Sequence, residues 1–190
     1  TSIYNKKNES EIEKYFLLAI ENSNIEEQIL DVYNYILDYY IQNNNDDKIL
    51  EYLNIIIQNS PPGELSEDTI EDWLNFARKL GKYESILDFV DKKLDKDITI
   101  EDKLFFLLEK AKTYYESGRF SEAIKILKDI LDNYEEQKDT YKIRFSEIYF
   151  ELGKIYLKEY YDFENSLNYF DLSIENDVSN ELAMQYSNSI

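Results

Sequence analysis

The feature that most constrains this chain is an internal repeat of its apolar residues at a step of 37 residues. The first half of each repeat carries apolar residues at three equivalent positions. In three successive repeats, read from the C-terminal one backwards, they are Leu107, Ala111 and Tyr114; Ile70, Leu74 and Ala77; and Tyr33, Leu37 and Tyr40. Toward the C-terminus the same pattern continues at a step of 42 or 43 residues. Self-similarity at such a period is typical of arrays of stacked supersecondary units. We therefore expect a repeat array rather than one globular core.

The spacing within each repeat identifies the units as helical. Apolar residues recur at intervals of 3, 4 or 7, as on one face of an amphipathic helix. The 190 residues include only 4 Gly and 2 Pro, which leaves little turn chemistry for a sandwich or barrel. The sequence predicts an all-α chain of about 10 helices, at residues 10–22, 27–43, 46–59, 67–80, 83–95, 100–117, 121–134, 139–159, 163–176 and 180–189.

Turn residues fall at one phase of the repeat. Gly118 lies between two apolar stripes in AKTYYESGRFSEAIKILKDIL, residues 111–131, and the 37-residue step carries it to Gly81 and Asn44. These residue types tolerate positive φ, so each is expected to turn a helical hairpin. Thr99 and Ser121 are expected to begin the helices that follow them. The predicted organisation is a polar segment at 1–9 and an array at 10–190, with hairpins at about 27–59, 67–95, 100–134 and 139–176 and single flanking helices.

The pattern resembles the tetratricopeptide (TPR) repeat family over nearly all of residues 10–190. Two units carry it best: Leu107, Ala111, Tyr114, Gly118, Phe120, Ala123, Leu127 and Ile130, and then Tyr149, Leu152, Gly153, Tyr156, Phe163, Ser166, Phe170 and Ser173. The resemblance implies a right-handed superhelical solenoid of antiparallel hairpins. Two features depart from the family: the step exceeds the usual period of about 34, and Ile49 and Ile86 stand where it has a small residue. A looser helical-hairpin solenoid is the alternative.

The resemblance also implies a function, a non-catalytic scaffold that binds a protein or peptide in a concave groove lined by the first helix of each hairpin. The repeat phase places these residues in the groove: Tyr35, Asp38, Asn75, Arg78, Lys79, Phe105, Leu108, Lys112, Tyr115, Phe150, Lys154, Leu157 and Lys158. We expect the basic ones to form a strip that favours an acidic segment or a C-terminal carboxylate. The alternative is that they are ordinary solvated side chains. The carboxylate clamp of the chaperone-binding members is not reproduced in full.

Composition argues against several other functions. The chain has 40 acidic and 21 basic residues, a formal net charge of −19, so direct binding of nucleic acid is not expected. Cys and His are both absent, which excludes thiolate chemistry, Cys/His zinc sites and histidine bases. Acidic pairs such as Glu101-Asp102 fall at helix starts and turns, where they cap and solvate. The sequence thus predicts no enzyme and no cofactor.

Two alternative functions and the compartment stay open at this level. The chain could be the effector-peptide sensor of a larger regulator, or an adaptor tethered to the cell envelope by a lipid. No run approaches 18 apolar residues, so no membrane span is expected. We expect a cytoplasmic protein, with a lipid-tethered extracytoplasmic one as the alternative. The sequence does not indicate the oligomeric state.

Overall fold

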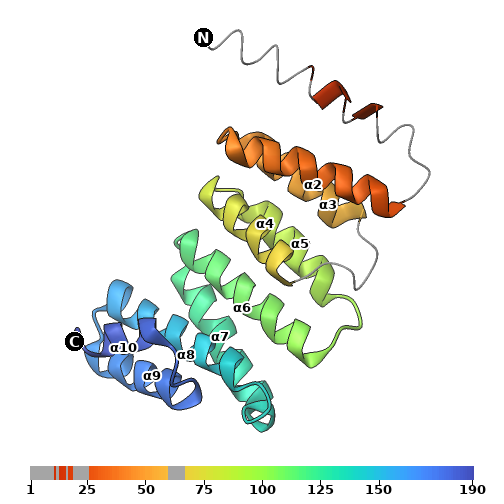
Figure 1. Ribbon diagram of the computed structural model, residues 1–190. Helices are drawn as coiled ribbons and strands as arrows, with labels where there is room; N and C mark the ends of the chain where they lie inside the picture. The colour runs from red at the N-terminus through yellow and green to blue at the C-terminus, as the bar shows by residue number, and fades with distance from the viewer. Residues whose placement is uncertain (1–10, 12, 16, 19–25, 60–66) are drawn as a thin grey trace. The chain divides into compact units, whose positions relative to one another are not determined.

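The computed structural model describes residues 11, 13–15, 17, 18, 26–59 and 67–190 (Figure 1). Its helices are α2 Glu26–Gln42, α3 Asp46–Asn59, α4 Glu67–Lys79, α5 Tyr83–Leu94, α6 Ile100–Glu116, α7 Phe120–Tyr134, α8 Lys142–Ile155, α9 Phe163–Asn176 and α10 Glu181–Ser187. The described part of the chain contains no strand, which confirms the all-α class and a helix number close to ten. The predicted segment 1–9 and much of the predicted helix 10–22 lie outside the described residues.

The chain divides into two compact units, residues 1–80 and 81–190, and the division falls inside the predicted hairpin 67–95. In the first unit α3 packs against both α2 and α4. In the second unit α6 packs against α5 and α7, α9 packs against α8 and α10, and α8 also contacts α6 and α7. Helices adjacent in the sequence are therefore adjacent in space within each unit. No helix in the described ranges has the length and hydropathy needed to cross a bilayer.

Aromatic and amide contacts hold the first unit together. Tyr40 and Tyr52 are buried, and their rings stack with centroids 5.6 Å apart. The Tyr52 hydroxyl donates a hydrogen bond of 2.6 Å to Glu13. Trp73, the single tryptophan of the chain, is buried in α4, and its indole N–H donates to the side-chain oxygen of Asn54 on α3 at 2.8 Å. The tryptophan is thus a packing residue that pins α4 to α3.

The predicted turn residues adopt the left-handed conformation. The φ angle is +66° at Gly81, +79° at Gly118 and 53° at Asn44, which confirms all three predictions. After α6, the Gly118 N–H donates to the Tyr115 carbonyl and the Arg119 N–H to the Tyr114 carbonyl, the pair of bonds that closes a Schellman motif. The sequence did not predict a fourth such residue, Tyr161, whose φ is 54°.

Replacing Gly118 with alanine is expected to destabilise the protein by about 1 kcal/mol, because an L-residue is strained at this φ. A Cβ atom at position 118 would have no atom within 4 Å, so the cost comes from the backbone alone. Urea unfolding followed by far-UV circular dichroism measures it. Gly118→Asn is the matched control and should cost less, because asparagine tolerates the left-handed region. An alanine variant as stable as the parent would contradict the assignment.

One predicted helix cap is confirmed, while a second cap and the extent of one helix differ from expectation. The Thr99 side chain caps α6 by accepting the Asp102 N–H at 3.1 Å, as predicted. The prediction for Ser121 was wrong: α7 begins at Phe120 without a side-chain cap, and the Ser121 hydroxyl donates to Glu122 instead. The predicted helix 139–159 begins only at Lys142, because a 3₁₀ turn, Glu135–Gln137, precedes it, and it ends in a π-helical turn, Tyr156–Tyr160.

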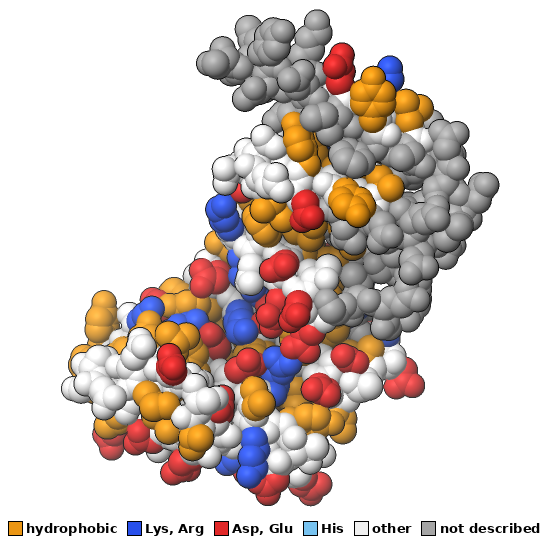
Figure 2. Space-filling model, viewed as in Figure 1, with side chains coloured by type: hydrophobic (Ala, Val, Ile, Leu, Met, Phe, Trp, Pro, Cys, Tyr) orange, Lys and Arg blue, Asp and Glu red, His pale blue; other side chains and the backbone are white. Residues whose placement is uncertain are grey.

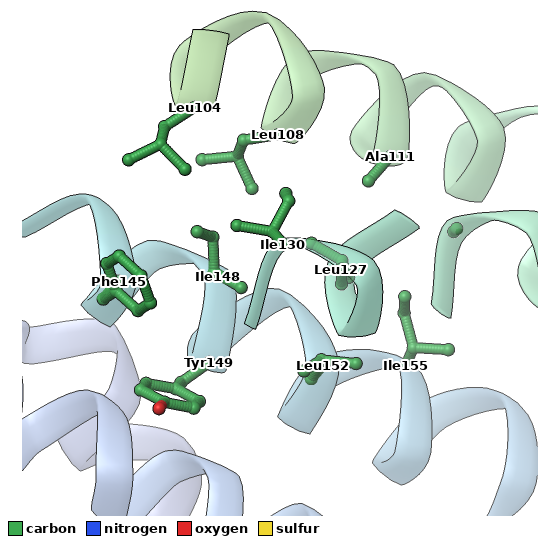
Figure 3. Close-up of a cluster of buried hydrophobic side chains, with 11 residues drawn as sticks. Leu104, Leu108, Ala111, Leu127, Ile130, Phe145, Ile148, Tyr149, Leu152 and Ile155 are labelled. Atoms are coloured by element: carbon green, nitrogen blue, oxygen red, sulfur yellow. The ribbon is translucent and has the colours of Figure 1, made fainter. Parts of the chain in front are cut away.

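The main core of the second unit is an apolar layer between α6, α7 and α8 (Figure 3). It consists of Leu104, Leu108, Ala111, Ala123, Leu127, Ile130, Phe145, Ile148, Tyr149, Leu152 and Ile155. The residues predicted to pack within the hairpin at 100–134 supply much of it. Leu108, predicted to face the groove, is fully buried in this layer, which corrects that prediction. The layer packs α6 against α8, the two helices that also carry the charged residues described below.

Small residues let α8 and α9 approach each other closely. Gly153 faces the Phe170 ring so closely that a Cβ atom there would lie 2.7 Å from two ring carbons. The Ser166 hydroxyl on α9 donates to the Gly153 carbonyl on α8 at 2.9 Å. Ser146 and Ser173 do the same reciprocally, each hydroxyl donating to the other residue's carbonyl at 2.8 Å. Backbone carbonyls are thus bonded across this helix pair as well as along it.

Asn180 ties the last helix to this contact. Its side-chain oxygen accepts the Ala183 N–H at 3.0 Å and so caps α10. Its side-chain nitrogen donates to the hydroxyls of Ser146 and Ser173, at 3.2 and 3.1 Å. One amide therefore joins α8, α9 and α10.

Candidate functional site

The second unit contains a hollow of about 520 Å³, which we call the α8 hollow. It is lined by Lys112, Ile143, Glu147, Phe150, Glu151, Asp177, Ser179, Asn180, Glu181 and Leu182, from α6, α8, the α9–α10 connection and α10. Two residues predicted for the groove, Lys112 and Phe150, are among them. Most of its lining comes from helices, and Asp177, Ser179 and Asn180 come from the α9–α10 connection.

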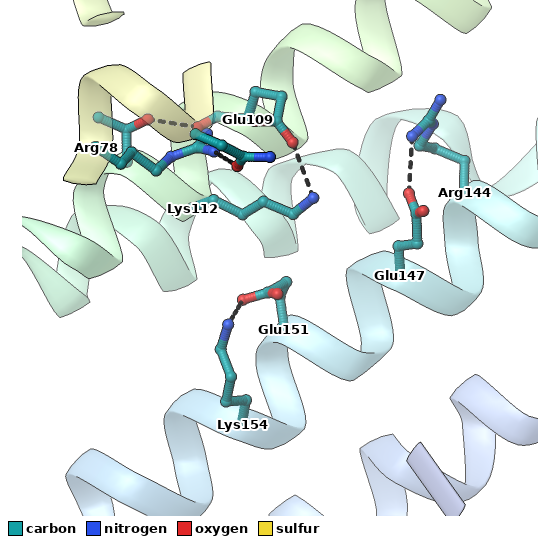
Figure 4. A network of polar contacts seen from close by, with 9 residues as sticks. Arg78, Glu109, Lys112, Arg144, Glu147, Glu151 and Lys154 are labelled. Carbon is teal, nitrogen blue, oxygen red and sulfur yellow. Dashed lines mark hydrogen bonds and ion pairs between the residues drawn. The ribbon is translucent and has the colours of Figure 1, made fainter. Parts of the chain in front are cut away.

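Lys112 extends from α6 toward α8 and lies among carboxylates (Figure 4). Its ammonium nitrogen is 2.8 Å from Oε1 of Glu109, a side chain that is only 2% exposed. Burial alone would lower the pKa of Lys112, but the carboxylates of Glu109, Glu151 and Glu147 outweigh it, so the pKa is raised. The lysine stays protonated and is balanced by acidic neighbours on both helices.

Two further ion pairs lie along α8. The Arg144 guanidinium is 2.8 Å from Glu147, and Lys154 pairs with Glu151 (Figure 4). Like the pair on α6, both join residues three positions apart on one helix. The sequence reasoning counted the lysines but missed these acids. Their spacing of three residues was the signal that could have found them.

Lys154 also brings two predicted aromatic residues together. Its ammonium nitrogen is 4.8 Å from the centroid of the Tyr115 ring and 5.9 Å from that of Phe150. The Tyr115 hydroxyl donates to Glu159 at 3.3 Å. Burial and this carboxylate together raise the pKa of Tyr115 to about 12. Lys158, the last lysine predicted for the groove, lies over the Tyr186 ring of α10, 5.4 Å from its centroid.

Phe105 is placed differently from its prediction. It was expected to meet a partner, but it is only 2% exposed, so its ring is not available for contact. The ring packs edge-on against Phe106 at 5.0 Å, and the Arg144 guanidinium covers it at 5.2 Å. Three apolar residues, Leu104, Phe105 and Phe106, follow one another and are all buried, so the helical phase alone could not identify an outward one.

Of the remaining predicted residues, Asn75, Arg78 and Lys79 belong to α4 in the first unit. Tyr35 and Asp38 lie on α2 of the same unit, and Leu157 lies in the turn Tyr156–Tyr160 of the second unit. The Arg78 guanidinium donates to the side-chain oxygen of Asn75 at 3.2 Å. Lys79 forms an ion pair of 2.8 Å with Asp46 at the start of α3. The cations predicted as one strip are thus divided between two units, and Lys79, Lys112 and Lys154 each pair with a carboxylate. Figure 2 shows basic and acidic side chains lying beside one another on the face that it presents.

The lining of the α8 hollow carries a surplus of negative charge. Four carboxylates, from Glu147, Glu151, Asp177 and Glu181, face the single ammonium of Lys112. Hydrogen bonds from the Ser179 hydroxyl and backbone N–H lower the pKa of Asp177, which keeps it ionised. Within the described ranges, neither Asp177 nor Glu181 forms an ion pair with a lysine or arginine.

The same lining has an apolar part. Ile143, in the first turn of α8, is 69% exposed, and Leu182 of α10 is 55% exposed. Phe150 also belongs to the lining, and its ring packs against Phe170 and Tyr186, with centroids 5.8 and 5.7 Å away. Apolar side chains exposed beside charged ones on rigid helices are suited to binding a segment of another chain.

Comparisons with known proteins do not assign the chain to a family. A comparison with models of protein families gives no match, and comparisons with curated proteins and with solved structures give none either. Among the residues that the structure describes, no three acidic side chains gather where they could hold a metal ion.

Proposed function

We propose that the chain is a non-catalytic scaffold that binds a segment of another protein in the α8 hollow. The observation that carries this proposal is the composition of the lining, in which the exposed side chains of Ile143 and Leu182 lie beside carboxylates on three different structural elements. A hollow of about 520 Å³ is within the range of ligand sites, roughly 300–1,000 Å³. The resemblance to TPR repeats, which bind peptides between their helices, supports the proposal.

Selection of peptides from a random displayed library against the full chain tests this function. We expect the enriched peptides to lose about tenfold or more in affinity for a Leu182→Asp variant, because a buried apolar contact would be replaced by a charge. Ile100→Asp is the matched control: Ile100 is 40% exposed on the first turn of α6, outside the hollow. Its affinity should match that of the parent. Selection without any enriched peptide, or peptides that bind both variants equally well, would contradict the proposal.

A further inference from the structure

We infer that the segment bound in the α8 hollow is basic and amphipathic, with Lys or Arg residues set between large apolar ones. This inference rests on the proposed function and specifies its ligand. It reverses the charge that the lysines in the sequence predicted for the partner. Three observations on the second unit carry it: the cations are already balanced, the outer acids are not, and the apolar residues lie next to those acids.

The cations of the site are balanced within the protein. Lys112 forms an ion pair with Glu109, whose side chain is 2% exposed, and Lys154 forms one with Glu151, whose side chain is 8% exposed. An acidic ligand that drew either lysine away would take an ion-pair contact from a buried carboxylate. Removing one member of a buried ion pair is strongly unfavourable. The hollow is therefore poorly suited to an acidic segment, although lysines line it.

The acidic residues at the rim of the hollow, in contrast, are accessible to a cation from a partner. Asp177 and Glu181 lie at the rim, on the α9–α10 connection and the first turn of α10, where no described lysine or arginine pairs with them. Glu147 is paired with Arg144, but its side chain is 38% exposed. A cation from a partner could contact these carboxylates without uncovering a buried group. The net charge of −19 over the whole chain would also attract a basic segment.

The apolar residues give such a segment its second contact. Ile143 lies one turn before Glu147 on α8, and Leu182 directly follows Glu181 on α10. Each rim carboxylate on a helix thus has an exposed aliphatic neighbour, and both belong to the lining of the same hollow. A segment that alternates cationic and apolar side chains matches both.

Two synthetic peptides of one design provide the test: acetyl-KLLKKLLK-amide and its acidic counterpart acetyl-ELLEELLE-amide. Each is titrated into the full chain, and binding is measured by isothermal titration calorimetry. We expect the basic peptide to bind and the acidic one not to. Glu147→Gln combined with Glu181→Gln should weaken binding of the basic peptide by about tenfold, or about 1.4 kcal/mol. Glu136→Gln combined with Glu164→Gln removes the same charge from exposed positions outside the hollow and should weaken it by less than about twofold.

Each other outcome overturns one of the two ideas. Binding of the basic peptide that both double variants weaken equally would reduce it to attraction by net charge, and the inference would fall. Binding of the acidic peptide that Leu182→Asp abolishes would also overturn the inference, while the proposed function would stand. If neither peptide binds and library selection also fails, the proposed function falls with it.

Discussion

Replacing Gly153 with valine is expected to lower the free energy of unfolding of the second unit by about 3 kcal/mol. The new Cβ atom would lie 2.7 Å from Cδ1 and Cε1 of Phe170, far inside van der Waals contact. The ring cannot move aside easily, because Phe170 is fully buried and packs against Phe150 and Tyr186. Overpacking of this kind typically costs 1–3 kcal/mol, and valine adds two methyl groups beyond the Cβ atom. Urea unfolding monitored by far-UV circular dichroism measures the loss.

A double-mutant cycle identifies the contact responsible. Phe170→Leu makes room beside position 153, so the loss from Gly153→Val should be smaller in the Phe170→Leu background than in the parent. The fluorescence of Trp73 measures the unfolding of the first unit separately, because the single tryptophan of the chain lies in that unit. Additive effects of the two substitutions would show that Phe170 is not what excludes a side chain at position 153.

The second large effect is expected from Lys112→Met, which keeps most of the aliphatic stem and removes the charge. The buried Glu109 would then lose the cation that lies 2.8 Å from it, and Glu147 and Glu151 would lose a nearby positive charge. We expect a loss of about 3 kcal/mol in the free energy of unfolding, the lower part of the range for breaking a buried pair. The raised pKa of Lys112 means that its stabilisation is complete below its unfolded pKa and is lost only above its folded pKa. The loss should therefore stay constant from about pH 6 to about pH 9.

Lys92→Met is the matched control for this prediction. Lys92 also pairs with an acid on its own helix, Asp88, at 2.6 Å, but the two side chains are 71% and 66% exposed. Surface pairs of this kind contribute little, so the change should stay below about 0.5 kcal/mol. Adding Glu109→Gln to Lys112→Met should recover part of the loss. Equal effects at positions 92 and 112, or no recovery, would contradict the assignment of a buried charge pair.

The turns and the packing faces were predictable because they depend on local chemistry. Only a few residue types adopt positive φ cheaply, so the recurrence of Gly81 and Gly118 at one phase was enough to locate two turns. Tyr161 was missed for the same reason, since tyrosine gives no signal for the left-handed region. There the backbone follows a π-helical turn, which accommodates part of the longer repeat step.

The candidate site was predictable only in part. Repeat phase correctly brought Tyr115, Phe150 and Lys154 into one neighbourhood. It placed Phe105 in the groove, because phase within a helix cannot show how deeply the neighbouring helix covers a residue. The charge of the site depends on acids contributed by α6, α8 and α10, and on the pairing of each lysine. A count of lysines along the groove cannot include either of these.

The amide of Asn180 has a consequence for chemical ageing. The Ser146 and Ser173 hydroxyls each give their single proton to a carbonyl across the α8–α9 contact, so only a donor suits them at position 180. Deamidation, the slow hydrolysis of asparagine to aspartate, would replace that donor with a carboxylate facing two oxygen lone pairs. The cap on α10 would survive, because aspartate also accepts the Ala183 N–H, but the link to the two serines would be lost. Stored protein would thus lose one of the links that hold its last helix through a change at one side chain, while the aromatic contacts of Tyr186 with Phe150 and Phe170 would remain.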